Sequence, residues 1–227
     1  MTELALTSGG RRLAANLVAP EGVTSGAGLL FVHGFGSSQR GYLERAGAAT
    51  RELGCTCLTF DLSGHGASEG DLSELFFRDH LGDVGTAYET LAAQPSVEAD
   101  RIGVCGASYG AYLSGYLVSI RPVARLLLRA PALYDDGVLD LQLRQLRPSR
   151  RMPEADDFLG AIGRFEHETL VVESERDETI PHPIVERYLD ALTHGHHRVI
   201  AGATHDLGRD DWRAEFRQIV VDWFRPL

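Results

Sequence analysis

Short apolar runs alternate with stretches of helical spacing along most of the chain. The runs end in glycine or charged residues, as expected of strands buried on both faces of a parallel sheet. The stretches between them repeat apolar residues with the period of helices that cover a sheet. This alternation predicts an α/β fold with a mostly parallel central sheet and helices on both faces. Strands are predicted at Leu29–His33, Cys55–Phe60, Arg101–Cys105, Arg125–Leu128, Leu170–Glu173 and His197–Ile200.

The chain is expected to begin with an antiparallel hairpin. Glu3–Thr7 and Leu13–Ala19 have strand character, and Gly9-Gly10 supplies the turn between them. A helix start is predicted at Asp71-Leu72-Ser73-Glu74, with Asp71 or Ser73 as its cap. Other helical segments are predicted at Tyr42–Leu53, which Gly54 ends, at Tyr109–Val118, and around Leu81–Leu91, Ile184–Leu192 and Trp212–Trp223.

One region departs from the alternation. Residues 134–164 are rich in Asp, Arg and Pro, and include Arg147-Pro148-Ser149-Arg150-Arg151. Only weak helical spacing is present there, at Leu139, Leu143 and Leu146. We expect a small cap or excursion over the sheet, so that residues 1–227 form one α/β domain.

The net charge and the amino-acid composition exclude several classes of binding partner and cofactor. The formal net charge is −10, from 22 basic and 32 acidic residues. Nucleic acid and anionic membranes select clustered positive charge, so neither is expected to bind. Lysine is absent, which excludes a Schiff-base or P-loop lysine. No apolar stretch approaches the roughly 18 residues of a membrane helix, and the first residues lack the pattern of a secretory signal. A cytoplasmic location is therefore expected.

The cysteines fall within apolar, strand-like segments. Cys55, Cys57 and Cys105 make an odd number, which favours buried free thiols in a reducing compartment over a disulfide framework. No second cysteine pair or nearby histidine pair accompanies Cys55 and Cys57, so no zinc site is predicted.

Gly-x-Ser-x-Gly occurs twice, around Ser68 and around Ser108, and is weak evidence in a chain with 25 glycines. A nucleophilic serine of this kind lies at a sharp turn from a strand into a helix, with small residues on either side. An apolar strand precedes Ser108 and a helix rich in small residues follows it. Loop residues Ser63-Gly64-His65-Gly66 separate Ser68 from its strand. Ser108 is therefore the predicted nucleophile.

A serine hydroxyl needs an imidazole to accept its proton. With this type of turn, the acid and the histidine follow the serine in that order. His205 lies in a loop between the last strand and the last helix, and is the predicted base. His194, His196 and His197 surround a turn and are interpreted as a solvated cluster.

The imidazole in turn needs a carboxylate to orient it. Glu175, Asp177 and Glu178 all follow the strand 170–173. Asp177 is the preferred acid, because it lies several residues beyond the strand and Ile180-Pro181 closes the loop behind it. Glu175 and Glu178 stay open as alternatives.

Acyl transfer also requires donors for the oxyanion, usually two backbone N–H groups. One is predicted at Tyr109, the residue after the nucleophile. The other is predicted at Phe35, in the glycine-rich loop His33-Gly34-Phe35-Gly36. His33 is interpreted as a structural hydrogen-bonding residue beneath this loop.

Together these residues resemble the α/β-hydrolase superfamily over about residues 28–225. Besides the segments above, the resemblance rests on Asp61-Leu62-Ser63-Gly64-His65-Gly66-Ala67-Ser68 and on Gly202-Ala203-Thr204-His205. It implies that Ser68 belongs to a structural loop. Among subgroups, the chain is most similar to small bacterial esterases of the feruloyl-esterase and dienelactone-hydrolase kind, although the latter carry cysteine as the nucleophile.

The expected activity is hydrolysis of a small carboxylic ester through an acyl–Ser108 intermediate, without a metal or organic cofactor. A thioester or a peptide amide is the alternative substrate class, and a non-catalytic binding module is a third possibility. The expected partner is a small-molecule ester. The last helix, with Trp212 and Trp223, either packs inward or supports a homodimer.

Overall fold

The computed structural model describes residues 1–146 and 152–227, which contain one sheet in the strand order β1-β2-β4-β3-β5-β6-β7-β8. β1 pairs antiparallel with β2 and β2 with β4, whereas the remaining pairs are parallel. This confirms the predicted mostly parallel sheet with an antiparallel N-terminal hairpin. The strands are β1 (Thr2–Ser8), β2 (Arg11–Val18), β3 (Gly28–Val32), β4 (Thr56–Phe60), β5 (Ile102–Ala107), β6 (Arg125–Arg129), β7 (Thr169–Ser174) and β8 (Gly195–Ile200).

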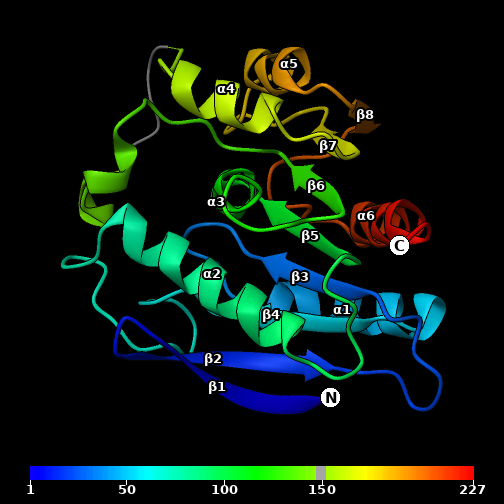
Figure 1. Ribbon diagram of the computed structural model, residues 1–227. Helices are drawn as coiled ribbons and strands as arrows, with labels where there is room; N and C mark the ends of the chain where they lie inside the picture. The colour runs from blue at the N-terminus through cyan, green and yellow to red at the C-terminus, as the bar shows by residue number, and fades with distance from the viewer. Residues whose placement is uncertain (147–151) are drawn as a thin grey trace.

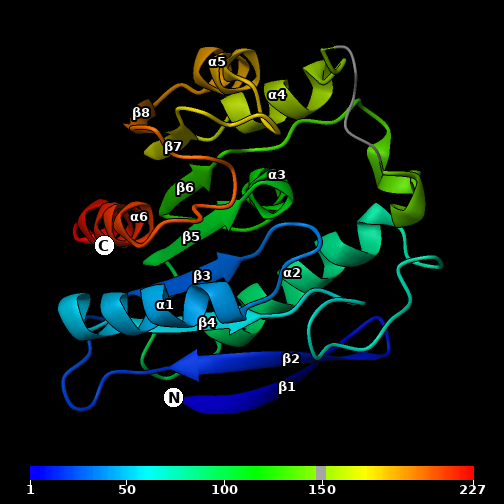
Figure 2. The same cartoon turned by 180° about the vertical axis from the view of Figure 1, so that it is seen from behind.

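Helices cover both faces of the sheet. The α-helices are α1 (Arg40–Leu53), α2 (Phe77–Ala92), α3 (Tyr109–Leu117), α4 (Asp156–Gly163), α5 (His182–Ala191) and α6 (Asp210–Phe224). Figure 2 shows α1 and α6 on one face, and Figure 1 shows α2 and α3 on the other. Within the described residues, none of these helices is both long and apolar enough to cross a bilayer.

The central strands are buried on both faces, so their side chains divide between two cores. In β3, Leu29 and Phe31 face the core beneath α1 and α6, whereas Leu30 and Val32 face the core beneath α2 and α3. The three cysteines are free thiols in the first of these cores, as the sequence predicted. Trp223 also faces inward, and its indole N–H donates to Leu126 O at 3.0 Å.

The segment between β4 and α2 corrects one prediction. Asp71 accepts the Ser73 N–H at 2.8 Å, as a helix cap would, but it closes only a turn. The helix begins after Phe76, whose N–H donates to Asp79 Oδ2 at 2.8 Å. Phe76 also forms a β-bridge with Gln142 from far along the chain. This long-range pairing holds the chain extended and delays the start of α2.

The predicted excursion lies between β6 and β7. Its described part contains two short 3-10 turns, η1 (Val138–Asp140) and η2 (Leu143–Gln145), followed by α4. The two turns lie beside the first turns of α2 (Figure 1), where Leu143 N–H donates to Leu75 O at 2.8 Å. Residues 147–151 of the predicted Arg- and Pro-rich segment lie outside the described residues.

Candidate active site

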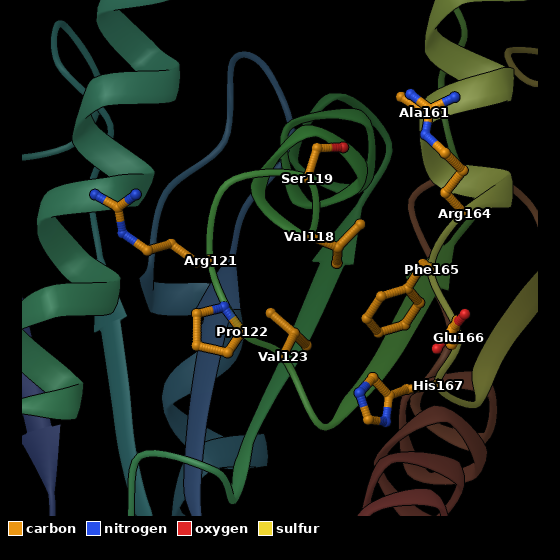
Figure 3. A pocket seen from close by; sticks show the side chains of 10 residues that line it. All are labelled: Val118, Ser119, Arg121, Pro122, Val123, Ala161, Arg164, Phe165, Glu166 and His167. Carbon is orange, nitrogen blue, oxygen red and sulfur yellow. The ribbon is translucent and has the colours of Figure 1, made fainter.

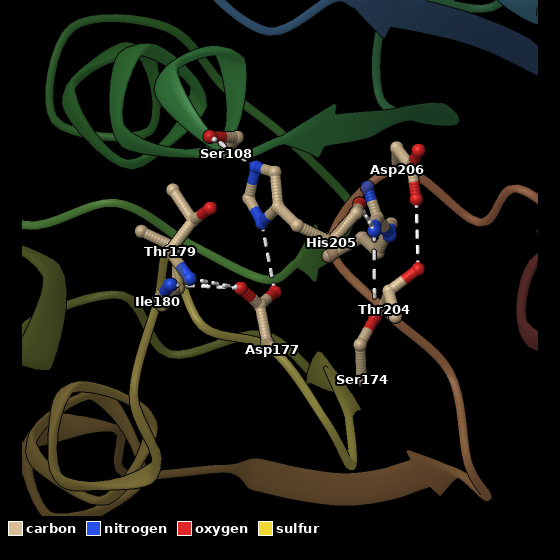
Figure 4. Close-up of polar contacts among 9 residues, drawn as sticks. Ser108, Ser174, Asp177, Thr179, Ile180, Thr204, His205 and Asp206 are labelled. Carbon is tan, nitrogen blue, oxygen red and sulfur yellow. Dashed lines mark hydrogen bonds and ion pairs between the residues drawn. The ribbon is translucent and has the colours of Figure 1, made fainter.

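The carboxyl ends of parallel strands meet at one edge of a sheet, where such folds bind ligands. Ser108 follows β5, Asp177 lies in the loop after β7, and His205 lies in the loop after β8. Ser108 Oγ lies 3.1 Å from His205 Nε2, and His205 Nδ1 lies 2.7 Å from Asp177 Oδ2 (Figure 4). The structure thus brings these three predicted residues together in one hydrogen-bonded chain.

Ser108 occupies a strained turn between β5 and α3. Its φ of 53° and ψ of −119° lie in a region that non-glycine residues avoid, at a cost of about 1–3 kcal/mol. The neighbouring glycines permit this geometry. A Cβ at Gly110 would lie 2.4 Å from the carbonyl oxygens of Val32 and His33, and one at Gly106 would lie 2.5 Å from Gly110 O. The turn therefore depends on the absence of side chains at both positions.

Ser68, in the second copy of the motif, has a structural environment. Its Oγ donates to Asp61 O at 2.6 Å and accepts the Ala14 N–H at 2.9 Å. The first bond lies within the loop after β4, and the second joins that loop to β2. The hydroxyl thus has two backbone partners and no histidine partner among the described residues.

Asp177 is held by donors on both carboxylate oxygens. Oδ1 accepts the N–H groups of Thr179 at 2.9 Å and Ile180 at 2.8 Å, while Oδ2 faces His205. Burial opposes ionisation, but the hydrogen bonds from His205 and the two amides outweigh it and lower the pKa of Asp177. The carboxylate is therefore ionised at neutral pH and oriented for the imidazole.

The two alternative acids of this loop, Glu175 and Glu178, do not contact the imidazole of His205. Glu175 Oε2 accepts the Gly202 N–H at 2.6 Å, which joins the loops after β7 and β8. Glu178 is exposed. Neither carboxylate contacts His205.

The predicted oxyanion loop approaches the nucleophile closely. A Cβ at Gly34 would lie 3.4 Å from Ser108 Cβ. The backbone N–H groups of Phe35 and Tyr109 have no acceptor among the described residues. Tyr109 N–H also lies in the first turn of α3, where the helix dipole favours negative charge. The Phe35 ring packs on Tyr109, with ring centroids 5.5 Å apart.

Three buried histidines pack beneath the loop that contains Phe35, on the side away from solvent. His33 donates from Nδ1 to Gly34 O at 2.8 Å and accepts Leu62 N–H at Nε2, 3.0 Å away. His65 Nε2 accepts the Gly36 N–H at 3.1 Å. These bonds tie both sides of Phe35 to the loop after β4, and they give His33 the structural position that the sequence suggested.

His80 completes the cluster through Tyr109. Its Nδ1 accepts the Tyr109 hydroxyl at 3.1 Å and its Nε2 donates to Ser63 O at 2.8 Å. Sequence reasoning missed His65 and His80. For His65 the signal was available, because a histidine between two glycines in a tight loop points to a backbone contact. For His80 the signal was its position four residues before Val84, on the predicted apolar face of the helix.

We expect this cluster to make stability depend on pH. Burial lowers the pKa of His33 to about 4 and that of His80 to about 3, whereas both would titrate near 6.5 in the unfolded chain. The stabilisation is full above the unfolded value and is lost as pH falls toward the folded values. Each histidine should contribute a slope of about 1.4 kcal/mol per pH unit between roughly pH 6.5 and 4.

Urea unfolding at several pH values measures this slope. His80→Asn should lower the slope of the free energy of unfolding against pH by the contribution of one histidine. The variant should also be somewhat less stable than the wild type at neutral pH. His194→Asn, at an exposed position before β8, should leave the slope as in the wild type. A wild-type free energy of unfolding that is equal at pH 7 and pH 5 would contradict the prediction.

In the part of the sequence that the structure describes, the other histidines after Ser108 form no hydrogen bond with the three residues of this hydrogen-bonded chain. His194 lies in the turn before β8, whereas His196 and His197 lie within the strand, and all three are exposed, as expected of a solvated cluster. His197 Nε2 and His182 Nδ1 each lie 2.9 Å from one oxygen of the buried Glu173. Within residues 1–146 and 152–227, no group of three or more His, Cys, Asp or Glu side chains is arranged to hold a metal ion.

A cavity of about 400 Å³ lies away from these residues (Figure 3). Val118, Val123, Phe165 and His167 contribute to its walls. These residues precede β6 and β7, so the cavity lies at the amino ends of the strands, opposite the edge that carries Ser108. The cavity is therefore separate from Ser108, Asp177 and His205.

Comparison with known proteins gives matches by sequence and by structure. The sequence profile of the alpha/beta hydrolase family matches residues 29–166. An uncharacterized protein of Mycobacterium tuberculosis is 28% identical over 185 residues, and the match covers 80% of this chain. The chain spans only 64% of the length of that relative.

Two solved structures share the fold. Est1E from Butyrivibrio proteoclasticus, solved with ferulic acid bound, has a TM-score of 0.76 at 16% identity, over 96% of each chain. A serine hydrolase without a lid from Xanthomonas campestris has a TM-score of 0.71 at 20% identity, over 99% of this chain and 94% of its own.

Proposed function

Since the chain belongs to the alpha/beta hydrolase family, we propose that it is a serine hydrolase that cleaves a small carboxylic ester through an acyl–Ser108 intermediate. The observation that carries the proposal is the continuous chain of hydrogen bonds from Ser108 through His205 to Asp177. Ferulic acid, bound in the Butyrivibrio structure, is an aromatic carboxylic acid, which supports carboxylic esters as the first class to test.

The positions of these atoms support the following acylation step. Ser108 Oγ attacks the ester carbonyl carbon while its proton passes to His205 Nε2. The N–H groups of Phe35 and Tyr109 donate hydrogen bonds to the carbonyl oxygen and stabilise the negative charge that develops on it. When the tetrahedral adduct collapses, the proton moves from Nε2 to the departing alkoxide, and the alcohol leaves.

Deacylation reverses these roles. A water molecule gives its proton to His205 Nε2 and attacks the acyl carbon, and the same two N–H groups donate hydrogen bonds to the second oxyanion. Collapse returns the proton to Ser108 Oγ and releases the carboxylic acid. Asp177 stays ionised throughout, where it holds the imidazole and stabilises the transient imidazolium.

Labelling with a fluorophosphonate probe tests the nucleophile directly. The wild type should be labelled stoichiometrically, and mass spectrometry should locate the adduct on the peptide that contains Ser108. Ser108→Ala should not be labelled, whereas Ser68→Ala should be labelled like the wild type. A folded wild-type protein that the probe fails to label would overturn the proposal and favour a non-catalytic binding module.

The choice of scissile bond needs a substrate panel, because a shared fold does not determine the substrate. Matched ester, thioester and anilide substrates with the same acyl group should be compared by kcat/KM. We expect the ester to be hydrolysed fastest. A higher kcat/KM for the thioester or the anilide would assign the same three residues to a thioesterase or an amide hydrolase.

A further inference from the structure

Arg129 is a buried cation at the carboxyl end of β6. It pairs with Ala107 of β5 on one side and with Val172 of β7 on the other, and only 7% of its surface is exposed. Its strand therefore lies between the strand that leads to Ser108 and the strand that leads to Asp177.

Arg129 contacts the main chain of His205 and of Ser108, and the side chain of Ser174, three residues before Asp177. Its guanidinium donates to the carbonyl oxygen of His205. The same Nη2 atom lies 3.4 Å from Ser174 Oγ, and Ser174 O accepts the Asp177 N–H at 3.1 Å. The Arg129 carbonyl oxygen accepts the Ser108 N–H at 2.9 Å.

We propose that Arg129 is a positioning residue, which holds the loop of His205 in register with Ser108 through its side chain and its carbonyl. This inference rests on the proposed function, because it concerns the alignment of the same nucleophile and base. Arg129 touches neither reacting atom, so it acts only through the residues that it holds.

The electrostatic setting of Arg129 argues against a role in stability alone. Burial lowers the pKa of the guanidinium, and Asp177 is among the charges that oppose this shift. Nε has no hydrogen-bond partner, and no carboxylate lies within ion-pair distance of the side chain among the described residues. A well-packed apolar side chain of similar volume often stabilises a buried site as well as a charged side chain does.

Residues with strained backbone conformations lie next to the segments that Arg129 contacts. In residues 1–146 and 152–227, the non-glycine residues with positive φ are Ser108, Ala130 and Leu207, at 53°, 41° and 49°. Ala130 directly follows Arg129, and Leu207 lies in the loop of His205. Strained backbone persists only where surrounding contacts hold it in place, and the guanidinium supplies one of those contacts.

Steady-state kinetics of three variants test the proposal. Arg129→Met removes the donors and the charge but keeps an unbranched side chain, Arg129→Lys keeps the charge, and Arg125→Met removes a cation at the opposite end of the same strand. We expect Arg129→Met to lower kcat by about 100-fold with little change in KM, as for a small misplacement of reacting groups. Arg129→Lys should recover part of the loss, and Arg125→Met should keep the wild-type kcat.

Two further measurements separate positioning from a purely structural role. The thermal midpoint of Arg129→Met should equal or exceed that of the wild type. In proton NMR, the His205 Nδ1–H resonance, identified by its loss in Asp177→Asn, should be broadened or shifted in Arg129→Met and unchanged in Arg125→Met.

The outcomes distinguish this inference from the proposed function. A wild-type kcat in Arg129→Met, an unperturbed His205 resonance, or an unfolded Arg129→Met protein would overturn the positioning role and leave the hydrolase proposal intact. A wild type that hydrolyses nothing would overturn the proposed function, and the NMR comparison would still decide whether Arg129 aligns His205.

Discussion

Replacing Ser108 with alanine is expected to lower kcat for hydrolysis of p-nitrophenyl acetate by about 10⁶-fold. Without Oγ no acyl intermediate forms, and His205 loses the atom 3.1 Å away from which it takes a proton. The N–H groups of Phe35 and Tyr109 remain, so a residual rate above that of water alone should persist. Purified variants and initial rates at saturating substrate measure the effect.

Ser68→Ala is the matched control, because Ser68 stands in the other copy of the same motif. Loss of its bonds to Asp61 and Ala14 should cost about 1–2 kcal/mol of stability, which urea unfolding would detect. Its kcat should equal that of the wild type. Substantial activity in Ser108→Ala, or its loss in a folded Ser68→Ala, would contradict the assignment of the nucleophile.

Asp177→Asn is expected to lower kcat by about 10⁴-fold. Two backbone donors, the N–H groups of Thr179 and Ile180, surround Oδ1. The amide of the variant must therefore turn its oxygen toward these donors and its NH₂ group toward His205 Nδ1. That orientation favours the imidazole tautomer with its proton on Nε2, which cannot accept the proton of Ser108.

The neighbouring acids provide matched controls for this substitution. Glu178→Gln makes the same change of charge at an exposed position of the loop and should keep the wild-type kcat. Glu175→Gln weakens the contact with Gly202 and should affect stability more than kcat. An Asp177→Asn protein as active as Glu178→Gln would contradict the role of Asp177.

Much of the fold follows from local patterns. The buried strands appear where short apolar runs end in glycine or a charged residue, and Gly54 ends α1 in the left-handed conformation, as its position after the last apolar residue predicted. The misplaced start of α2 shows the limit of such signals. Asp71 does cap its local turn, but the pairing of Phe76 with Gln142 decides where the helix begins.

Ser108 could be predicted as the nucleophile from the sequence because the requirements of such a turn are local. The strand before it, the helix after it, and Gly106 and Gly110 on either side lie within a few residues. Arg129 shows the opposite case. A charged residue directly after the run Leu126-Leu127-Leu128 was visible in the sequence, but its contact with the carbonyl of His205 joins residues 76 positions apart.

The sequence by itself therefore determined the alternation of strands and helices, and it was sufficient to propose Ser108 as the nucleophile, followed by an acid and a histidine in that order. Only the tertiary structure selected Asp177 over Glu175 and Glu178, because that choice depends on which carboxylate faces an imidazole 28 positions away. It also revealed the histidine cluster beneath Phe35 and the buried guanidinium of Arg129. The hydrophobic pattern of a sequence shows which faces of its helices and strands are apolar. A hydrogen-bonded site depends instead on how side chains from separate loops are oriented, and that orientation is set by the tertiary structure.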